Sequence, residues 1–472
     1  DSTYGSFKST NATRGGTVFA AANDGMLHAF NSANGSERWA FVPSFVMPNM
    51  RHLADTNYDH RYYADSSPTV ADVCSSPGTG TPSVCSSATA WKTILVAGLD
   101  KGGCGYYALD VTDPANPKGL WEFTHAQMGY SYGHPVITRR KDGKWVAIFT
   151  SGYNNVPGTC GKTTGDGIGR VFVVDAMTGT LLDTISTGEG SAVTPSNLSK
   201  LNAWVEVAEL NTADVLYAGD MLGNVWRIDF DDNHAPSGKE AFKLATLRNA
   251  AGTAQPISVK PELAYTNGSR VVMVGTGRLL SLDDLSNAQG QSVYGLKDDL
   301  STTGLSNPRA NASVKSHTLT TTTGSNGQTI RTISGDAIDW ATDKGWYFDF
   351  PSTGSGNASE RVNVDMQLQY NILTVATNVP ESNACTAGGY GWLYYVDLET
   401  GKQVTTATDS AIGTRLSSNT MVSGIKTVKL QNGKTVTIVS DTLGDVRTNP
   451  SPSPTGAAAG TARRTMWREL LD

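Results

Sequence analysis

The sequence contains no long hydrophobic segment and little charge. None of its 472 residues belongs to a run that approaches the roughly 18 consecutive apolar residues of a membrane helix. Charged residues make up 17%, with 37 Lys and Arg against 43 Asp and Glu, and neither sign forms a long run. These absences exclude membrane insertion and argue against a nucleic-acid partner. Because the chain starts at Asp1 without Met, we expect that a signal peptide or larger N-terminal region has been removed.

Catalytic and metal-binding motifs of defined spacing are also absent. The sequence has no Gly-x-Ser-x-Gly elbow, no His-Glu-x-x-His helix and no Cys-x-x-Cys pair. The seven His residues are scattered, which favours packing or surface roles over a shared set of ligands. The sequence therefore predicts that the chain is not an enzyme, and it gives no catalytic residue and no organic cofactor.

Only five cysteines occur, and their positions predict disulfides. Cys74 and Cys85 bracket a Ser, Pro, Gly and Thr loop whose ends would otherwise be free, so a bridge between them is expected. Cys104 and Cys160 each lie in a Gly-rich segment beside a strand-like run and form the second candidate pair. Cys385 is left without a partner. This cysteine usage favours an exported protein in an oxidising compartment.

Glycine and proline interrupt the chain too often for long helices. With 50 Gly and 19 Pro, the short apolar runs between them indicate an all-β protein. Several segments combine alternating strands with Gly or Asn turns, the pattern of a β-hairpin. The clear copies are 18–35, 96–114, 167–179, 216–232 and 388–401, and the weaker ones are 272–284 with 291–299, and 344–350.

The repeats predict a β-propeller, because a radial array of four-stranded blades protects the edges of its sheets. We expect one propeller of seven or eight blades over residues 1–448. A Pro, Ser and Ala linker with a C-terminal docking segment would follow over 449–472. The repeated tryptophans are expected to fill the gaps between blades rather than to bind a ligand. They are Trp39, Trp121, Trp226, Trp346 and Trp392.

Longer blocks of the sequence, in order along the chain, resemble one family. The blocks are HRYYADSSPTVADV (60–73), YALDVTDPANPKGLWEF (107–123), GYSYGHPVITRRKDGKWVAIFTSGYNN (129–155), YAGDMLGNVWRIDF (217–230), VGTGRLLSLDDL (274–285), GWYFDF (345–350), TNVPESNACTAGGYGWLYYVDLETG (377–401) and TMWREL (465–470). They are similar to the C-terminal domain of the PilY/PilC-type type IV pilus tip adhesins. The resemblance implies a modified propeller of the pyrroloquinoline quinone type at the end of a larger exported protein.

The resemblance also implies partners and a location. Proteins of this family associate with minor pilins at the pilus tip and act in pilus biogenesis, surface adhesion and twitching motility. The implied setting is the fimbrium, the cell surface or the outer membrane, with a host cell or an abiotic surface as a further contact. The inserted stretches 44–65, 74–91 and 300–335 are candidates for such contacts, because loops on rigid scaffolds carry binding.

A calcium loop is implied by the resemblance at the segment before Tyr217. There Glu209, Asn211 and Asp214 fall on ligand positions of the family's loop, but the residues that would supply the middle carboxylate are missing. Calcium takes six to eight oxygen ligands, so the shortened loop predicts weak calcium binding or a plain β-turn.

A second calcium candidate comes from spacing alone. Asp229, Asp231, Asn233, Ser237 and Glu240 match the ligand positions of a twelve-residue calcium loop. His234 stands where the sharp turn of that loop requires Gly, and Pro236 constrains it further. Asp and Asn in turns often give such matches, so a turn without metal is the favoured alternative.

Two other functions fit a propeller of this kind. A quinoprotein dehydrogenase would need a metal-bound quinone, an acidic base and, in many cases, two adjacent cysteines, and no adjacent cysteines occur. Asp65 and Asp100 are the conceivable bases, although aspartates in turns usually shape the backbone. A scaffold of the outer-membrane assembly type shares the repeat but does not explain blocks 60–73, 129–155 and 465–470.

Overall fold

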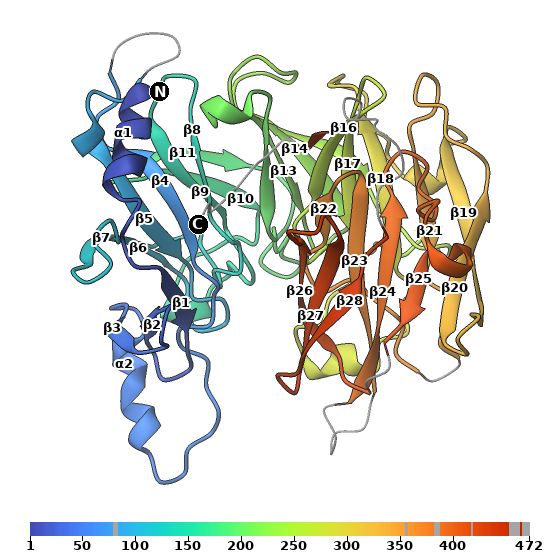
Figure 1. Ribbon diagram of the computed structural model, residues 1–472, viewed down its shortest axis with the longest axis horizontal. Coiled ribbons are helices and arrows are strands. Elements are labelled where there is room, and N and C mark those ends of the chain that lie inside the picture. The colour runs from blue at the N-terminus through green and yellow to red at the C-terminus, as the bar shows by residue number, and fades with distance from the viewer. Residues whose placement is uncertain (79–83, 355–356, 382–387, 417–418, 453–462, 465–472) are drawn as a thin grey trace. The chain divides into compact units, whose positions relative to one another are not determined.

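The computed structural model describes residues 1–78, 84–354, 357–381, 388–416, 419–452 and 463–464 (Figure 1). Its chain divides into two compact units. Unit 1 contains Asp1–Leu216 and Ile228–Ala241, and unit 2 contains Tyr217–Arg227 and Phe242–Asp472. Nearly all regular structure in the described residues is β-strand, which confirms the all-β prediction.

Three sheets lie in unit 1, and neighbouring strands in each are antiparallel. Their strand orders are β1-β2-β3, β4-β5-β6-β7 and β11-β10-β9-β8. The bounds are β1 (Thr17–Ala21), β2 (Leu27–Asn31), β3 (Glu37–Phe41), β4 (Thr69–Cys74), β5 (Trp91–Ala97), β6 (Tyr106–Asp110), β7 (Lys118–Phe123), β8 (Val136–Arg139), β9 (Trp145–Thr150), β10 (Arg170–Asp175) and β11 (Leu181–Ser186).

A fourth sheet has the order β12-β13-β14-β15. The chain passes between the two units within three of its strands. The bounds are β12 (Leu201–Val205), β13 (Ala213–Gly219), β14 (Asn224–Asp229) and β15 (Ala241–Thr246).

Unit 2 contains an eleven-stranded sheet and a three-stranded sheet among its described residues. Their orders are β22-β23-β24-β25-β20-β19-β21-β18-β17-β16-β29 and β26-β27-β28. The bounds are β16 (Glu262–Thr266), β17 (Ser269–Gly275), β18 (Ser292–Asp298), β19 (Val314–Thr323), β20 (Thr329–Gly335), β21 (Gly345–Asp349), β22 (Gln367–Gln369), β23 (Ile372–Pro380), β24 (Gly389–Asp397), β25 (Gly413–Arg415), β26 (Val422–Lys429), β27 (Thr435–Asp441), β28 (Val446–Pro450) and β29 (Arg463–Arg464). Because eleven strands form one continuous sheet, the blades are not all separate sheets, and the expected number of seven or eight blades stays a prediction.

The burial of each strand follows its sequence pattern. Every residue of β9 and of β23 is buried. The nearly continuous apolar run of β9 predicts a strand covered on both faces, whereas β23 also buries the polar residues Thr374, Thr377 and Asn378. Strand β27 instead alternates between buried and half-buried residues, the period of two of a sheet with one covered face. The local pattern therefore sets which face of each strand enters the core.

Helices are short in the described residues. The α-helices are α1 (Ser2–Thr10), of nine residues, and α2 (Met47–Met50), of four. Asp1 caps α1 by accepting the N–H of Thr3, and Phe7 anchors the helix in a core that includes Trp91. Single 3₁₀ turns span Arg51–Ala54, Ala88–Ala90, Thr159–Gly161, Ala208–Leu210, Leu282–Leu285, Pro308–Ala310 and Thr408–Ser410. The repeat pattern did not indicate α1.

The stretch 300–335 is largely a hairpin rather than a free loop. Strands β19 and β20 pair with each other along most of their length. Strand β19 also pairs in parallel with β21, and β20 pairs with β25. The hairpin thereby joins an array of four strands (β22–β25) to an array of five (β21, β18, β17, β16 and β29) in the eleven-stranded sheet. Residues 314–323 and 329–335 are thus strands of the sheet rather than a free loop, and a role of this stretch in contacts with partners stays a prediction.

The C-terminal region is described only in part. Strand β28 reaches Pro450, beyond the predicted end of the propeller at 448. In β29, Arg464 pairs with Ala264 and Arg463 with Tyr265 of β16. Residues 453–462 and 465–472 lie outside the described residues, so the docking segment over 449–472 stays a prediction.

Tryptophans of the last strand in a sheet pack on the turn of a neighbouring sheet. Trp39 of β3 donates its indole N–H to the carbonyl of Pro114, which follows β6, at 2.9 Å. Trp121 of β7 donates to the carbonyl of Ala176, which follows β10, at 3.0 Å. In that turn Gly179 has a φ of +69°, and a Cβ there would lie 2.6 Å from the Trp121 ring. A small residue with positive φ is therefore required under the indole.

Unit 2 contains a similar contact among its described residues, here between the two strand arrays of its eleven-stranded sheet. Trp346 of β21 donates its indole N–H to the carbonyl of Leu398, which follows β24, at 3.4 Å. Trp226 instead donates its indole N–H to Asp220 within its own hairpin. The ring centre of Trp392 lies 3.8 Å from the guanidinium carbon of Arg331. The prediction of packing between blades is confirmed for Trp39, Trp121 and Trp346.

Both predicted disulfides are present. Cys74 bonds to Cys85 and Cys104 bonds to Cys160, with Cα atoms 5.8 and 6.1 Å apart. The first closes a local loop of sequence separation 11, and the second joins segments 56 residues apart. Cys385 lies outside the described residues.

Replacing Gly179 by Ala should destabilise the fold more than the same change at Gly188. Both glycines have a positive φ, +69° and +72°, so each Ala costs about 1 kcal/mol for its left-handed backbone. Only at Gly179 does the new methyl group collide with Trp121, which adds about 1–3 kcal/mol. Urea unfolding of both variants measures the difference. Equal losses would show that the indole does not rest on this turn.

Removing the Cys104–Cys160 bridge should cost more stability than removing Cys74–Cys85. The longer loop loses more entropy when the unfolded chain is cross-linked, and separations of 56 and 11 give a difference of about 1 kcal/mol. Paired Cys→Ser variants compared by urea unfolding check this. The Cys74→Ser, Cys85→Ser variant should keep the native circular dichroism spectrum, and loss of that spectrum would contradict the local role of the bridge.

Candidate functional site

The loop that leads into β13 is held by its backbone. Asn211 has a left-handed conformation, with φ 47° and ψ 39°. Its carbonyl accepts the N–H of Arg139 at 2.8 Å and the hydroxyl of Thr138 at 2.7 Å. The side chain of Glu209 is exposed. The predicted ligands Glu209 and Asn211 therefore lie in a turn fastened to the end of β8.

Asp214 links this loop to the second candidate. Its carboxylate accepts the N–H of Glu206 at 3.2 Å, and its backbone carbonyl accepts the N–H groups of Phe230 and Asp231 at 3.0 and 3.1 Å. The two segments that the sequence singled out for calcium thus lie side by side in unit 1, at one end of β13 and β14. Spacing along the chain did not predict that they meet.

The second loop begins where β14 ends, at Asp229. The carboxylate of Asp229 accepts the N–H groups of His234 and Lys239, both at 3.2 Å. Asp231 accepts the backbone N–H of Asn233 at 3.1 Å and its amide group at 2.9 Å. Asp231 also lies 2.9 Å from Nδ1 of His234. These bonds fold residues 229–239 back on the end of the strand.

Burial opposes the ionisation of Asp231, but its hydrogen bonds dominate. Bonds from His234 and Asn233 hold the pKa of Asp231 below its usual value. The carboxylate is therefore an anion at neutral pH. Its favourable interactions would be lost only as the pH falls through this lowered pKa.

Of the five residues matched to the calcium template, two converge. Asp229 and Asp231 share a cluster with His234, the residue that stands where the template requires Gly. Asn233 turns its amide nitrogen toward Asp231, and Glu240 bonds to Asp229 through its backbone carbonyl. Sequence reasoning missed His234 as a member of the site. The feature of the sequence that could have indicated it is its position three residues after Asp231, but a calcium-loop template gives no score to a histidine there.

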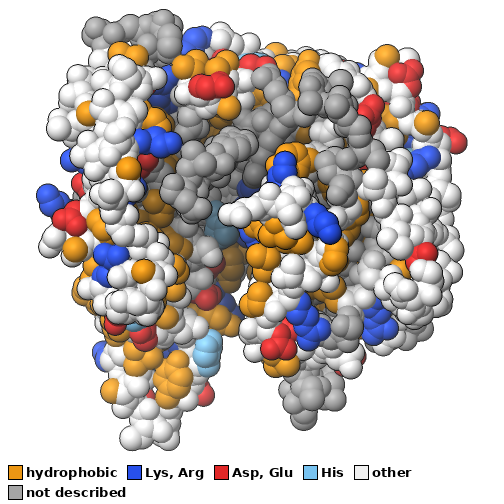
Figure 2. Space-filling model, viewed as in Figure 1, with side chains coloured by type: hydrophobic (Ala, Val, Ile, Leu, Met, Phe, Trp, Pro, Cys, Tyr) orange, Lys and Arg blue, Asp and Glu red, His pale blue; other side chains and the backbone are white. Residues whose placement is uncertain are grey.

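The inserted stretch 44–65 lies at the end of unit 1 that carries β1–β3. It contains α2 and extends away from the strands (Figure 1), with hydrophobic side chains among polar ones on its surface (Figure 2). Its exposed apolar and aromatic residues are Met47, Leu53, Tyr58 and Tyr62. This loop therefore presents four large apolar or aromatic side chains to solvent.

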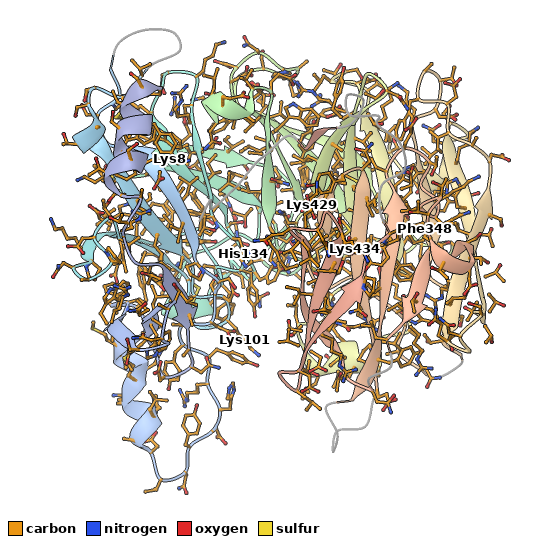
Figure 3. All side chains as sticks on the ribbon, viewed as in Figure 1. Lys8, Lys101, His134, Phe348, Lys429 and Lys434 are labelled. Atoms are coloured by element: carbon orange, nitrogen blue, oxygen red, sulfur yellow. A yellow bond between two sulfur atoms is a disulfide. The ribbon has the colours of Figure 1, made fainter. Side chains whose placement is uncertain are left out.

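The two conceivable bases of a quinoprotein lie near this loop. Burial raises the pKa of Asp65. Burial first, and then the charges of Asp100 and Asp65, raise the pKa of Tyr132. The ammonium of Lys101 lies 4.6 Å from the ring centre of Tyr62 (Figure 3). These groups form a surface cluster of tyrosines and charges.

The fold and its loops match one family. A family profile described as the PilY1 beta-propeller domain matches residues 1–329, which is more than half of the chain. The chain belongs to the PilY1 family. This confirms the resemblance seen in the sequence blocks and establishes an all-β propeller fold.

Two curated relatives and one solved structure support the assignment. The chain is 32% identical to a type IV pilus biogenesis factor PilY1 homolog of Xylella fastidiosa, over 100% of this chain and 36% of that protein. It is 31% identical to the type IV pilus biogenesis factor PilY1 of Pseudomonas aeruginosa, over 84% and 36%. The chain thus spans about a third of the length of these relatives.

The crystal structure of the PilY1 C-terminal domain of Pseudomonas aeruginosa superimposes with a TM-score of 0.73. Sequence identity is 25%, and the match covers 96% of this chain and 95% of that domain. The chain therefore corresponds to nearly all of a PilY1 C-terminal domain. Among the described residues, no helix is both long and apolar enough to cross a membrane.

Calcium should stabilise this domain little. The turn at Glu209–Asp214 offers few oxygen ligands, whereas a site filled at a hundred times its dissociation constant would add about 2.7 kcal/mol. Thermal unfolding with millimolar calcium, and then with excess chelator, should therefore give nearly the same Tm. A rise of several degrees that disappears in Asp214→Ala would contradict this expectation.

Proposed function

We propose that this domain acts in type IV pilus biogenesis, surface adhesion and twitching motility through contacts with other proteins. The observation that carries the proposal is the match to the PilY1 C-terminal domain over almost the full length of both chains. The chain's own motifs add support, since they include no catalytic elbow or zinc helix. The expected partners are minor pilins at the pilus tip, with a host-cell or abiotic surface as a second contact.

The location follows from the same proposal. Two disulfides suit an exported protein, because such bonds persist in oxidising compartments. We place the domain at the pilus tip, the cell surface or the outer membrane, as the C-terminal part of a larger protein. We further propose seven or eight propeller blades, formed by the six sheets of the described residues.

The stretch 44–65 is the proposed contact surface. It presents Met47, Tyr58 and Tyr62 with exposed fractions of 53, 42 and 39%. Amphipathic aromatic residues of this kind are enriched where proteins bind one another. The scaffold beneath it is a packed sheet, so the loop can change its side chains without loss of the fold.

A quinoprotein dehydrogenase is the second candidate. The observation in its favour is that Asp100 pairs in a β-bridge with Ser131, the residue before Tyr132, which brings an acid near a phenol. Asp65 is the second conceivable base. A dehydrogenase of this kind would require a bound quinone and a metal ion, and one of the two aspartates would act as the base. A scaffold for outer-membrane assembly is the third candidate, distinguished by its partners.

Changing the loop should reduce pilus function without unfolding the domain. In the parent protein, Tyr58→Ser with Tyr62→Ser should lower twitching and the number of surface pili, and deletion of the whole domain should lower both further. Val193→Ser is the matched control, because Val193 is 93% exposed in a different loop of unit 1. Motility assays and counts of sheared pili, with secretion of each variant verified, measure the effect.

Two results would redirect the assignment. Normal pili in the deletion strain, together with quinone-dependent oxidation of an alcohol by the purified domain, would favour the dehydrogenase. Normal pili with no oxidation would favour the assembly scaffold, and pull-down against minor pilins and outer-membrane assembly proteins would then separate these partners. Loss of pili with no oxidation supports the proposed function.

A further inference from the structure

Two carboxylates and one imidazole converge at the end of β14. Asp229, Asp231 and His234 each offer one ligand atom, and these atoms all lie within 4.8 Å of one another. Nδ1 of His234 is 2.9 Å from one oxygen of Asp231 and 3.9 Å from one oxygen of Asp229. Ligand atoms bound at about 2.0–2.2 Å to one metal ion lie roughly 3–4 Å apart, so the three need only small side-chain rotations to share an ion.

The electrostatics of the cluster also point to a cation. The side chains of Asp229 and Asp231 are only 1% and 9% exposed. Among the described residues, His234 is the only basic side chain within ion-pair distance of either carboxylate. Lys239 is the lysine of the same loop, and it directs its ammonium to Asp183 at 2.9 Å. Backbone N–H groups hydrogen-bond both carboxylates, but among the described residues neither has a lysine or arginine within ion-pair distance, so a divalent ion would supply the positive charge that they lack.

The donor set indicates which ions fit. Calcium takes six to eight oxygens, and here Asn233 presents its amide nitrogen to Asp231 while Glu240 lies outside the cluster. Imidazole suits zinc, nickel and copper, and zinc accepts nitrogen and carboxylate ligands together with water. A set of two oxygens and one nitrogen therefore favours a transition metal over calcium.

We propose that Asp229, Asp231 and His234 form a binding site for a divalent transition-metal cation of the zinc class. The ion would draw the loop 229–239 together at the point where Phe230 and Asp231 bond to the carbonyl of Asp214. Metal binding would thereby stiffen both loops at this end of β13 and β14. The site is independent of the pilus function proposed above.

Calorimetric titration of the tag-free domain with zinc tests the proposal. We expect about one ion per chain, and binding weakened about tenfold or more in His234→Ala and in Asp231→Asn, each of which removes a ligand. His28→Ala is the matched control. His28 also contacts two carboxylates, Asp24 at 2.8 Å and Glu37 at 2.7 Å, but through opposite ring nitrogens, so the three cannot share one ion.

A second measurement follows the loop itself. Zinc should slow trypsin cleavage after Lys239 in the unchanged protein and in His28→Ala, and should have no effect in His234→Ala. Circular dichroism verifies folding, and His234→Gln replaces any alanine variant that does not fold.

Three results would overturn the proposal. The first is equal zinc affinity in the unchanged protein and in both ligand variants, which marks an adventitious ion only. The second is a calcium affinity above that of zinc that is lost in Asp231→Asn. The third is loss of zinc binding in His28→Ala while His234→Ala still binds.

Discussion

The contact between a tryptophan of one sheet, or of one strand array within the eleven-stranded sheet, and the turn of the next is the interaction on which the fold depends. A small sheet cannot bury both of its faces alone, so each must be fixed against a neighbour. The indoles of Trp39, Trp121 and Trp346 do this with one hydrogen bond to a backbone carbonyl and the area of a large ring. The turn that contacts Trp121 has glycine at position 179 for two reasons. Its φ is positive, and a side chain there would collide with the indole. The strand that carries the tryptophan and the turn that it contacts thus form one repeated packing unit.

This arrangement separates the scaffold from the surface that binds. Strands such as β9 and β23 are buried throughout, so their residues serve packing. The residues free to vary lie in the turns at the ends of strands and in the inserted loops. The stretch 44–65 and the loop 229–239 are both of this kind. One presents exposed tyrosines for a proposed protein partner, and the other gathers carboxylates and an imidazole for a proposed metal ion.

The sequence predicted what depends on local pattern. Alternating strands, glycine turns, the repeated tryptophans and the Cys74–Cys85 bridge were visible in it, because each rests on spacing within one or two elements. The Cys104–Cys160 pair was found from the Gly-rich, strand-flanking setting that the two cysteines share. The pairing of β19 with β21 and of β20 with β25 was not visible. Residues 318–323 read as a polar, Thr-rich stretch, and only the pairing with distant strands makes them part of a sheet. Helix α1 was missed for a similar reason, because its main anchor is a distant core around Trp91.

The candidate site shows the same limit. Asp229 and Asp231 could be selected from spacing, but the role of His234 depends on how the loop closes, and the meeting with Asp214 depends on the register of β13 and β14. A template fixed to calcium counted His234 against the site. The geometry places it among the ligand atoms.

Hydrogen exchange of the indole N–H groups tests the central claim most directly. In a domain labelled with ¹⁵N-tryptophan, the indoles of Trp39, Trp121 and Trp346 should exchange only when the sheets separate, at rates close to those of the buried strand amides. Exchange of these three at the rate of free indole, while the amides of β9 and β23 remain protected, would show that the sheets are held together without the tryptophan contacts.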